Sequence, residues 1–264
     1  MTQISIINLL HKNEKWLKHL LRTAKISVEN EIIRIHSMRG FHFESILPIQ
    51  LNINKDSAHF LGLLFGDSCS TKQTSAKLGL SNTNLKLLHI TRNQLEETFL
   101  QPSSKIKIQI KVSHQLQEQE MVEIANIFRI GRENINQTIN SLCKQVNFEI
   151  FVNNRPLKRV IFDELIPQID EILDKEELLS FFGGVLDADG NIRKDFIAVT
   201  LGSEKEIKII SKTIKRLFQV NPHVTIRKGK NAWDLRIFNT TTIHHVLKDV
   251  IPFLHTNKGF DILA

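Results

Sequence analysis

The feature that most constrains the fold is an internal repeat, which two separate pairs of segments reveal. The first pair of segments is FEIFVNNRPLKRVIFDELIPQI at 148–169 and WDLRIFNTTTIHHVLKDVIPFL at 233–254. Each has the pattern of a strand followed by a helix that ends in Ile-Pro, and Phe148 and Trp233 are 85 residues apart. HFLGLLFGDS at 59–68 and SFFGGVLDADG at 180–190 form the second pair, in which Asp67 and Asp189 are 122 residues apart. We predict that the following helices keep this separation, with Leu85 matching Ile207, Leu88 matching Ile210 and Leu95 matching Leu217. The difference between 122 and 85 predicts 37 extra residues in the first half, between about 113 and 147.

Apolar periodicity predicts the same element order in each half: helix, two strands, helix, two strands, helix. In the first half the predicted helices are 56–66, 83–100 and 155–172, and the predicted strands are two within 68–82, then 105–113 and 147–153. In the second half the helices are 175–187, 203–219 and 240–252, and the strands are two within 189–201, then 223–228 and 232–238. The chain therefore divides into an N-terminal extension (1–54), a first half (55–173) with a partly helical insertion at about 114–146, and a second half (174–264).

Small residues recur on the first helix of each half. Gly62 and Gly66 are four residues apart, as are Gly184 and Ala188. Residues at this spacing share one helix face, and without large side chains they let two helices approach more closely than usual. We therefore predict that these two helices pack against each other.

Each of these helices ends in an aspartate, Asp67 or Asp189. A carboxylate at a helix C-terminus opposes the helix dipole, and two neighbouring carboxylates repel each other. A hard divalent cation would relieve both effects, because Mg²⁺ binds through one or two carboxylates together with water and phosphate oxygens. In a basic protein this arrangement suits metal-assisted phosphodiester cleavage.

The segment FFGGVLDADG resembles the motif that names the LAGLIDADG homing endonucleases, and FLGLLFGDS resembles a more degenerate copy of it. The resemblance covers about residues 56–264. It implies an α+β fold of two pseudo-symmetric αββαββα halves, with the motif helices at their interface and antiparallel sheets forming a saddle over DNA. It also implies that the chain acts alone as a monomer on a long, non-palindromic target and leaves short 3′ overhangs.

Carried onto this sequence, the resemblance assigns catalysis to Asp67, Asp189 and Lys258, and metal binding to Asp67, Asp189 and the residues before them, Gly66 and Ala188. The expected cofactor is Mg²⁺, for which Mn²⁺ can substitute, and the acids act as metal ligands and not as covalent nucleophiles. Lys258 is nominated because PFLHTNKG resembles the region of a basic residue near the scissile phosphates. Asp187 has Phe65 as its counterpart, so we assign it no metal. Ser68 departs from the usual glycine after the first acid, and PQIDEILDK of the first half has no matching lysine.

The charge balance agrees with a polyanionic partner. The chain has 35 Lys and Arg against 28 Asp and Glu, a formal charge of +7, which favours nucleic acid first and an anionic membrane surface second. In KIKIQIKVS (105–113), isoleucines and a valine alternate with polar residues, so one face is predicted to be buried and the other to meet DNA. The alternative is a solvated strand whose lysines protect a sheet edge. The candidate DNA-binding residues are Lys77, Lys105, Lys107, Gln109, Lys111, Arg193, Thr225, Arg227, Lys228, Lys230 and Arg236.

Several alternatives stay open. The same fold can support an RNA maturase, with intron RNA as its partner, or a non-cutting DNA-binding regulator. The basic helix at 11–25 either packs on the body or contacts flanking DNA. A calcium loop at DADGN is disfavoured, because counting from Asp187 the twelfth residue is Ala198 where an EF-hand has Glu. Two distant cysteines, no secretory signal and no intein junction lead us to expect a free-standing intracellular protein, cytoplasmic if prokaryotic, with no membrane partner.

Overall fold

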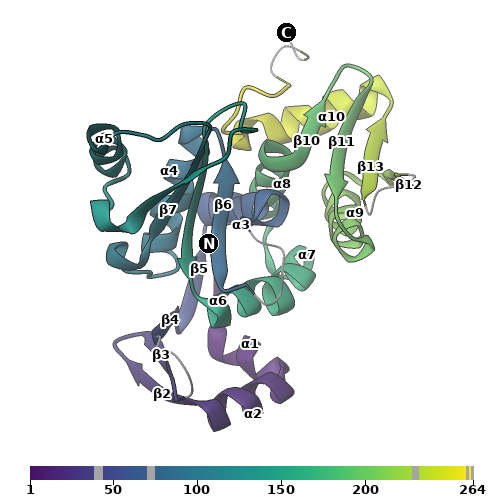
Figure 1. Cartoon of the computed structure of the whole chain (residues 1–264). Helices are drawn as coiled ribbons and strands as arrows, with labels where there is room; N and C mark the ends of the chain where they lie inside the picture. The colour runs from purple at the N-terminus through teal and green to yellow at the C-terminus, as the bar shows by residue number, and fades with distance from the viewer. Residues whose placement is uncertain (39–43, 70–74, 228–231, 260–261, 263–264) are drawn as a thin grey trace. The chain divides into compact units, whose positions relative to one another are not determined.

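The computed structural model of the chain describes residues 1–38, 44–69, 75–227, 232–259 and 262 (Figure 1). By its internal contacts the chain divides into two compact units. The first unit comprises 1–2, 53–67 and 166–264, and the second comprises 3–52 and 68–165. Within the described ranges, no helix has both the length and the apolar character that a membrane span requires.

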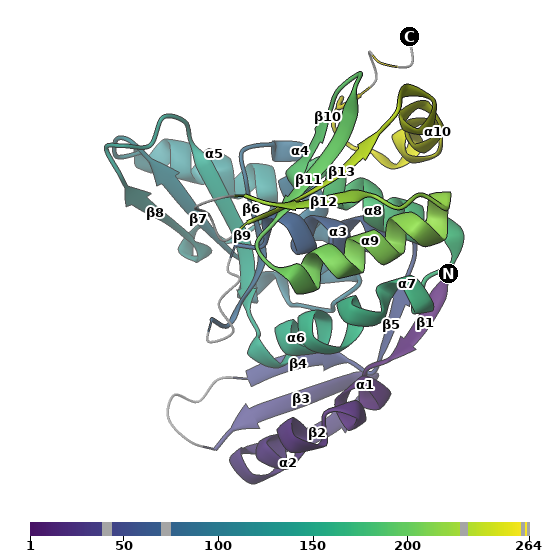
Figure 2. The same cartoon turned by 90° about the vertical axis from the view of Figure 1, so that its right-hand side faces the viewer.

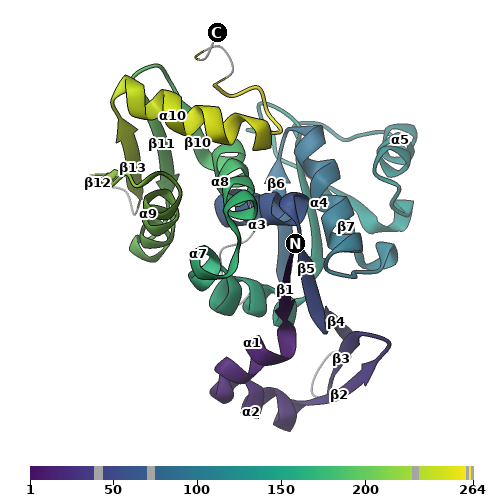
Figure 3. The same ribbon diagram turned by 180° about the vertical axis from the view of Figure 1, so that it is seen from behind.

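The first unit contains both predicted motif helices and a four-stranded sheet. Helix α3 (Lys55–Asp67) packs along α8 (Lys175–Asp189), and an antiparallel sheet follows in the order β10-β11-β13-β12. Helices α9 and α10 cover the buried face of this sheet (Figures 2 and 3). The bounds are β10 Gly190–Ile192, β11 Phe196–Leu201, α9 Glu204–Phe218, β12 His223–Ile226, β13 Trp233–Phe238, α10 Thr240–Val250 and the 3₁₀ turn η5 Ile251–Phe253.

The second unit contains another four-stranded sheet, in the order β6-β9-β7-β8, and the N-terminal residues from Gln3 onward. Helix α4 packs against β6 and β9. The bounds around this sheet are β6 Lys77–Asn82, α4 Leu85–Glu97, η1 Ser103–Lys105, β7 Lys107–Val112, α5 Glu118–Phe128, η2 Arg132–Asn134, β8 Ile135–Ile139, β9 Asn147–Asn153 and α6 Arg155–Arg159. Predicted strand structure near Ser68 is reduced to a bridge between Ser68 and Leu80, and 70–74 lie outside the described residues.

Strand registers show the internal repeat but correct the separation predicted for its second helix. Leu80 pairs with Ile150 as Val199 pairs with Leu235, which sets the separation at 119 residues and not 122. The N-caps Asn84 and Ser203 agree with 119, and so do the buried residues Phe99 and Phe218. The predicted matching of Leu85 with Ile207 is wrong, because Leu85 is 45% exposed whereas Ile207 is buried. The connection from Asp189 to β11 is therefore three residues shorter than the connection from Asp67 to β6.

The insertion adds an edge strand to the first-half sheet. It contains the predicted helical stretch as α5, in which Met121 and Phe128 are buried, and then β8, which runs parallel to β7. All other neighbouring strands in the two four-stranded sheets are antiparallel. A parallel neighbour requires a crossover connection, and α5 supplies it.

The predicted helix at 155–172 is broken into shorter pieces. It consists of α6, the π-helical η3 (Val160–Leu165), the 3₁₀ turn η4 (Ile166–Gln168) and α7 (Ile169–Ile172). Pro167 lacks an N–H and clashes with a regular preceding turn, so a continuous α-helix cannot pass through it.

The N-terminal extension contains more secondary structure than the one basic helix predicted at 11–25. It folds as β1 (Thr2–Ser5), α1 (Ile6–Lys12), α2 (Glu14–Thr23), β2 (Ala24–Glu29), β3 (Ile32–Ser37), β4 (Glu44–Pro48) and β5 (Gln50–Ile53). Strands β2, β3 and β4 form one sheet, and β1 pairs with β5. The described part of this extension is shown in purple in Figure 2.

Candidate functional site

The glycines of α3 and α8 lie where the two helices touch. A Cβ added to Gly62 would lie 2.0 Å from the Phe181 carbonyl oxygen, and one added to Gly184 would lie 2.1 Å from the His59 carbonyl oxygen. A Cβ on Gly66 would lie 2.5 Å from the Ala188 Cβ. The two backbones are therefore in direct contact, which only glycine permits.

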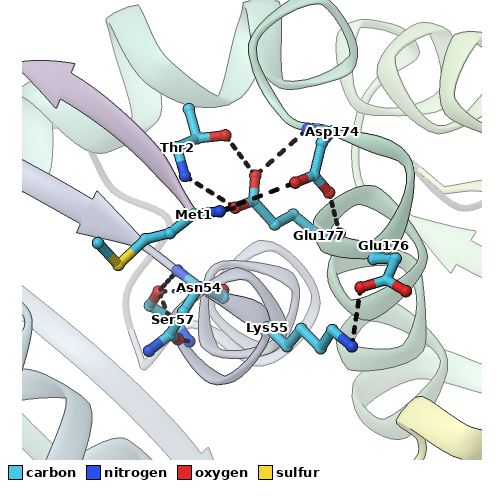
Figure 4. A network of polar contacts seen from close by, with 8 residues as sticks. All are labelled: Met1, Thr2, Asn54, Lys55, Ser57, Asp174, Glu176 and Glu177. Carbon is cyan, nitrogen blue, oxygen red and sulfur yellow. Dashed lines mark hydrogen bonds and ion pairs between the residues drawn. The ribbon is translucent and has the colours of Figure 1, made fainter.

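Polar contacts also tie the two helices together at their N-terminal ends (Figure 4). Asp174 and Glu177 form a capping box at the start of α8, and Thr2 donates its N–H and hydroxyl to the buried Glu177 carboxylate. The Lys55 ammonium lies 2.8 Å from Glu176, and the Ser180 hydroxyl donates to the Lys55 carbonyl at 2.6 Å. These contacts fix the register of α3 against α8.

The opposite ends of α3 and α8 bring Asp67 and Asp189 together. A Cβ on Gly66 would lie 3.5 Å from the Asp189 Oδ2, so the Asp189 carboxylate lies beside the residue that precedes Asp67. Burial and the Asp67 charge raise the pKa of Asp189 from 3.8 to about 7, and the Lys258 ammonium only partly offsets them. The structure thus holds the carboxylates of Asp67 and Asp189 close together, and the Asp67 charge favours the neutral form of Asp189.

Lys258 lies near this pair but bonds to the helix end. Its Nζ donates to the carbonyls of Leu186 and Asp187 at 2.9 Å each, and lies 3.5 Å from that of Ala188. Burial lowers the pKa of Lys258, whereas the charges of Asp187, Asp67 and Asp189 act against that decrease. Its counterpart in the first half, 85 residues earlier, is the buried apolar Leu173. The second half therefore supplies a basic residue near the acids, whereas the matching position of the first half does not.

Asp187 has a role that the sequence did not reveal. His59 Nε2 donates to its Oδ2 at 2.9 Å, the His255 N–H donates to the same oxygen at 2.7 Å, and the Thr256 N–H and hydroxyl donate to Oδ1. Burial opposes ionisation of Asp187, but these donors outweigh it and lower the pKa of Asp187 below its ordinary value. This carboxylate thus joins α3, α8 and the segment that carries Lys258.

The repeat relation explains why this contact occurs once. At a separation of 122, His59 corresponds to Phe181 and Phe65 corresponds to Asp187. On one side of the helix pair the rings of Phe65 and Phe181 meet edge to face at 5.9 Å, and on the other side His59 meets Asp187. The same pair of positions is apolar on one side and ionic on the other. In the sequence, the signal for this contact was that Phe65 and Asp187 differ in kind at equivalent positions of the repeat. The sequence alone, however, does not identify His59 as the partner of Asp187.

The donor set at Asp67 and Asp189 fits a divalent cation that completes its shell from outside the protein. Among the described residues, no group of three or more His, Cys, Asp or Glu side chains gathers into a metal cage. Mg²⁺ needs only one or two carboxylates when water and phosphate oxygens supply the rest. Burial and the Asp67 charge both raise the pKa of Asp189, and a bound cation would offset the repulsion between the two carboxylates.

The first-half sheet has one apolar and one polar face. Ile106, Ile108, Ile110 and Val112 are fully buried. Gln109 and Lys111 lie on the opposite face of β7, as Lys107 does, and Lys77 reaches that face from β6. Lys105 precedes the strand, and its ammonium lies 2.7 Å from the Glu44 carboxylate.

The second-half sheet has a comparable polar face. Arg227 and Arg236 lie over it, and Thr225 pairs in register with Asp234. Arg193 lies in the turn after β10, with its guanidinium 5.7 Å from the Phe196 ring. Lys228 and Lys230 lie outside the described residues.

Two acids on these faces were not among the candidate residues. Glu149 and Asp234 are each 5% exposed and bind the basic side chains around them. Their separation of 85 residues, already visible in the repeat, was the signal that could have identified them.

No family model and no curated protein matches the sequence. Among solved structures, the chain is similar to mesophilic variants of the homing endonuclease I-DmoI, with 12% identity and a TM-score of 0.49 over 75% of this chain and 96% of that chain. It is similar to an I-DmoI variant in complex with its target DNA and Mn, with 13% identity and a TM-score of 0.48 over 75% and 94% of the two chains. It is also similar to full-length DUF199/WhiA from Thermatoga maritima, with 13% identity and a TM-score of 0.47 over 79% of this chain and 58% of that chain. The solved structures that this chain resembles also include the N-terminal LAGLIDADG domain of DUF199/WhiA, and these likenesses concern the fold alone.

Proposed function

We propose that the chain is a divalent-metal-dependent endonuclease of the LAGLIDADG type, which hydrolyses both strands of double-stranded DNA. The observation that carries this proposal is the meeting of Asp67 and Asp189 at the C-terminal ends of two buried helices, where burial and mutual repulsion raise the pKa of Asp189 to about 7. Such a pair is costly without a cation. A pair of carboxylates that destabilises the folded protein at a helix interface is typical of a functional site.

Each residue of the site has a proposed task. Asp67 and Asp189 hold the metal, and the small residues Gly66 and Ala188 let the two carboxylates approach. Lys258 keeps a positive charge near the acids and stabilises the end of α8. A divalent cation bound there would neutralise charge on the phosphate and lower the pKa of water. We propose Mg²⁺, with Mn²⁺ as a functional substitute.

The two polar sheet faces are proposed to bind DNA. Lys neutralises phosphates, whereas Arg and Gln can also read base edges in the major groove. Because the two halves carry different side chains on these faces, we propose a long, asymmetric target, cleavage with short 3′ overhangs, and action as an intracellular monomer. The division into extension, first half and second half, and a role in intron homing, belong to this proposal.

Cleavage of a randomised duplex library tests the proposal. Purified protein is incubated with the library in Mg²⁺ or in EDTA, and new ends are sequenced. Discrete ends that require Mg²⁺ and vanish in Asp189→Asn are expected. The matched control is Asp195→Asn, which removes an exposed acid in the turn between β10 and β11 and should leave the ends unchanged.

A second readout does not require cleavage. Mg²⁺ should raise the melting temperature of the wild-type protein at pH 8 and leave Asp189→Asn unaffected, because bound ligand stabilises only a folded protein that has the site. Salt-sensitive DNA binding without cutting would instead favour a non-cutting regulator. Preferential binding of structured RNA would favour a maturase.

A further inference from the structure

Glu149 lies at the centre of a charged cluster on the first-half sheet. Its Oε2 lies 2.9 Å from the Lys77 ammonium and its Oε1 lies 2.5 Å from the Lys111 ammonium. Lys77 also donates to Gln109 Oε1 at 2.9 Å. We call Glu149, Lys77, Gln109 and Lys111 the Glu149 cluster. Its acid is 5% exposed, whereas the two lysine side chains are 30% and 43% exposed, so the carboxylate lies beneath the cations.

Asp234 occupies the same place on the second-half sheet. Arg227 Nε lies 2.8 Å from its Oδ1, and an Arg236 terminal nitrogen lies 3.2 Å from its Oδ2. The Thr200 hydroxyl donates to Asp234 Oδ1 and accepts from Arg227, at 2.8 and 2.9 Å. We call Asp234, Thr200, Arg227 and Arg236 the Asp234 cluster. The arginines are 44% and 39% exposed above a buried acid.

The strand registers make the two clusters repeat equivalents. Glu149 on β9 lies between Ser81 on β6 and Gln109 on β7, and Asp234 on β13 lies between Thr200 on β11 and Thr225 on β12. The same registers place Lys111, two residues beyond Gln109, at the position of Arg227, two residues beyond Thr225. Each half therefore places an acid on its central strand and one of the two bound cations on the same neighbouring strand.

The second cation of each cluster keeps its contacts with the central acid and with an aromatic ring, although it lies on a different strand in each half. In the first half, Lys77 on β6 lies 4.3 Å from the centre of the Phe151 ring on β9. In the second half the equivalent position of Lys77 holds Phe196, and that of Phe151 holds Arg236, which lies 5.6 Å from the Phe196 ring. The cation and the ring have exchanged strands, yet the cation still lies over a ring and still bonds to the central acid. A side chain placed only to cover the surface would not need this exchange.

A carboxylate on a DNA-facing surface weakens binding to phosphate unless it does something else. Here burial acts to raise the pKa of each acid, but the donors outweigh it and hold the pKa of Glu149 and of Asp234 below the ordinary values. Each acid stays ionised and holds two cations whose side chains are 30–44% exposed. A cation held in one place can distinguish base edges, whereas a freely moving one contacts any phosphate.

We propose that Glu149 and Asp234 are positioning residues that determine sequence specificity, each by fixing two cations of its sheet for base readout. The inference rests on the proposed function, because it assumes that the polar faces meet DNA. It predicts that removing an acid has opposite effects on generic and on selective binding. Generic affinity rises because one negative charge is lost from the polar sheet face itself, while selectivity falls because the cations are released.

The test measures metal-free binding of a randomised duplex library, followed by sequencing of the bound fraction. Glu149→Gln and Asp234→Asn should each bind generic duplex about two- to tenfold more tightly, with a steeper salt dependence. Each should lower the enrichment of preferred bases about tenfold or more, and the two should do so at different positions of the enriched sequence. Glu118→Gln is the charge-matched control, because it releases Arg132 outside both clusters and should change neither property.

Two further variants separate charge from position and guard against loss of folding. Glu149→Asp and Asp234→Glu keep the charge but move the carboxylate, so generic affinity should stay at the wild-type value while enrichment at the affected positions falls. Melting curves establish that each variant is folded at the assay temperature. Wild-type enrichment in folded Glu149→Gln and Asp234→Asn would overturn the inference and leave the endonuclease proposal intact. A wild-type protein that binds no duplex at all would overturn both.

Discussion

At the scale of single residues, two aspartates on one helix show how neighbouring carboxylates can have opposite energetic roles. Asp187 is held ionised by His59, Thr256 and the His255 N–H, which lower its pKa. Asp189, two residues later, is pushed toward the neutral form by burial and by Asp67. Asp187 therefore stabilises the fold as an anion, whereas Asp189 destabilises it unless a proton or a cation is present.

This contrast predicts the pH dependence of stability without metal. Because the pKa of Asp189 rises from 3.8 to about 7 on folding, its contribution is fully present below pH 3.8 and is lost as pH rises through about 7. The free energy involved is at most about 4 kcal/mol, at about 1.4 kcal/mol per pH unit, and the partial exposure of Asp189 reduces it. In EDTA, Asp189→Asn should therefore gain melting temperature over the wild type at pH 8 and little at pH 4.

Asp187→Asn is the matched comparison, and its effect has the opposite sign. Its lowered pKa contributes stability above pH 3.8 that is lost as the pH falls through the folded-state value. The variant should lose about 3 kcal/mol or more at pH 8, because it breaks a buried charged network. Differential scanning calorimetry across pH measures both variants. A less stable Asp189→Asn protein at pH 8 without metal would contradict the repulsion between Asp67 and Asp189.

At the scale of elements, the helix pair α3–α8 depends on the absence of two side chains. A Cβ at Gly62 or Gly184 would come within 2.1 Å of a carbonyl oxygen on the facing backbone. The helices cannot keep their spacing around such an atom, and neither backbone can move without displacing what packs on it.

Gly62→Ala and Gly184→Ala should each reduce the free energy of unfolding by about 3 kcal/mol or more, at the upper end of overpacking effects. Urea denaturation measures the change. Gly202→Ala is the control, since a Cβ there would meet only the Glu206 carboxylate at 3.7 Å. Equal stabilities for all three variants would show that α3 and α8 are less closely packed than the structure indicates.

Elements that the sequence predicted well are those in which local pattern and tertiary packing agree. The alternation along β7 follows from its one buried face, and the small-residue spacing on α3 and α8 follows from the face on which these two helices touch. The β2–β3 hairpin was missed because its two-residue turn is Asn30-Glu31, both with positive φ (47° and 64°), where Gly is the usual signal. The contacts of Asp187, Glu149 and Asp234 were missed because each joins residues from separate segments, which no local pattern encodes.

At the scale of the whole molecule, the compact units do not follow the repeat. Helix α3 comes from the first half of the sequence, yet it belongs to the unit that holds the whole second half. The 85-residue and 122-residue repeats therefore describe how the sequence is organised, and the contacts describe a different division of the chain.

A fragment of residues 174–264 should consequently not fold by itself. It retains α8 but lacks α3, so the glycine-bearing face of α8 and its buried neighbours would be exposed. Circular dichroism and size-exclusion chromatography should show an unfolded or aggregated fragment. Joining 53–67 to 166–264 through a flexible Gly/Ser linker should restore a cooperative melting transition. A monomeric 174–264 that melts cooperatively would contradict this division.

The pairing of α3 with α8 also has a consequence for synthesis of the chain. Every residue of α3 from Ser57 to Phe65 is buried in the finished protein, on all sides of the helix. Its partner begins at Lys175, more than 100 residues after Asp67, and ribosomes add about 5–20 residues per second. For roughly 5–20 s the emerging chain must carry an apolar helix without its partner, so α3 is the segment of this protein on which we expect a ribosome-associated chaperone to act.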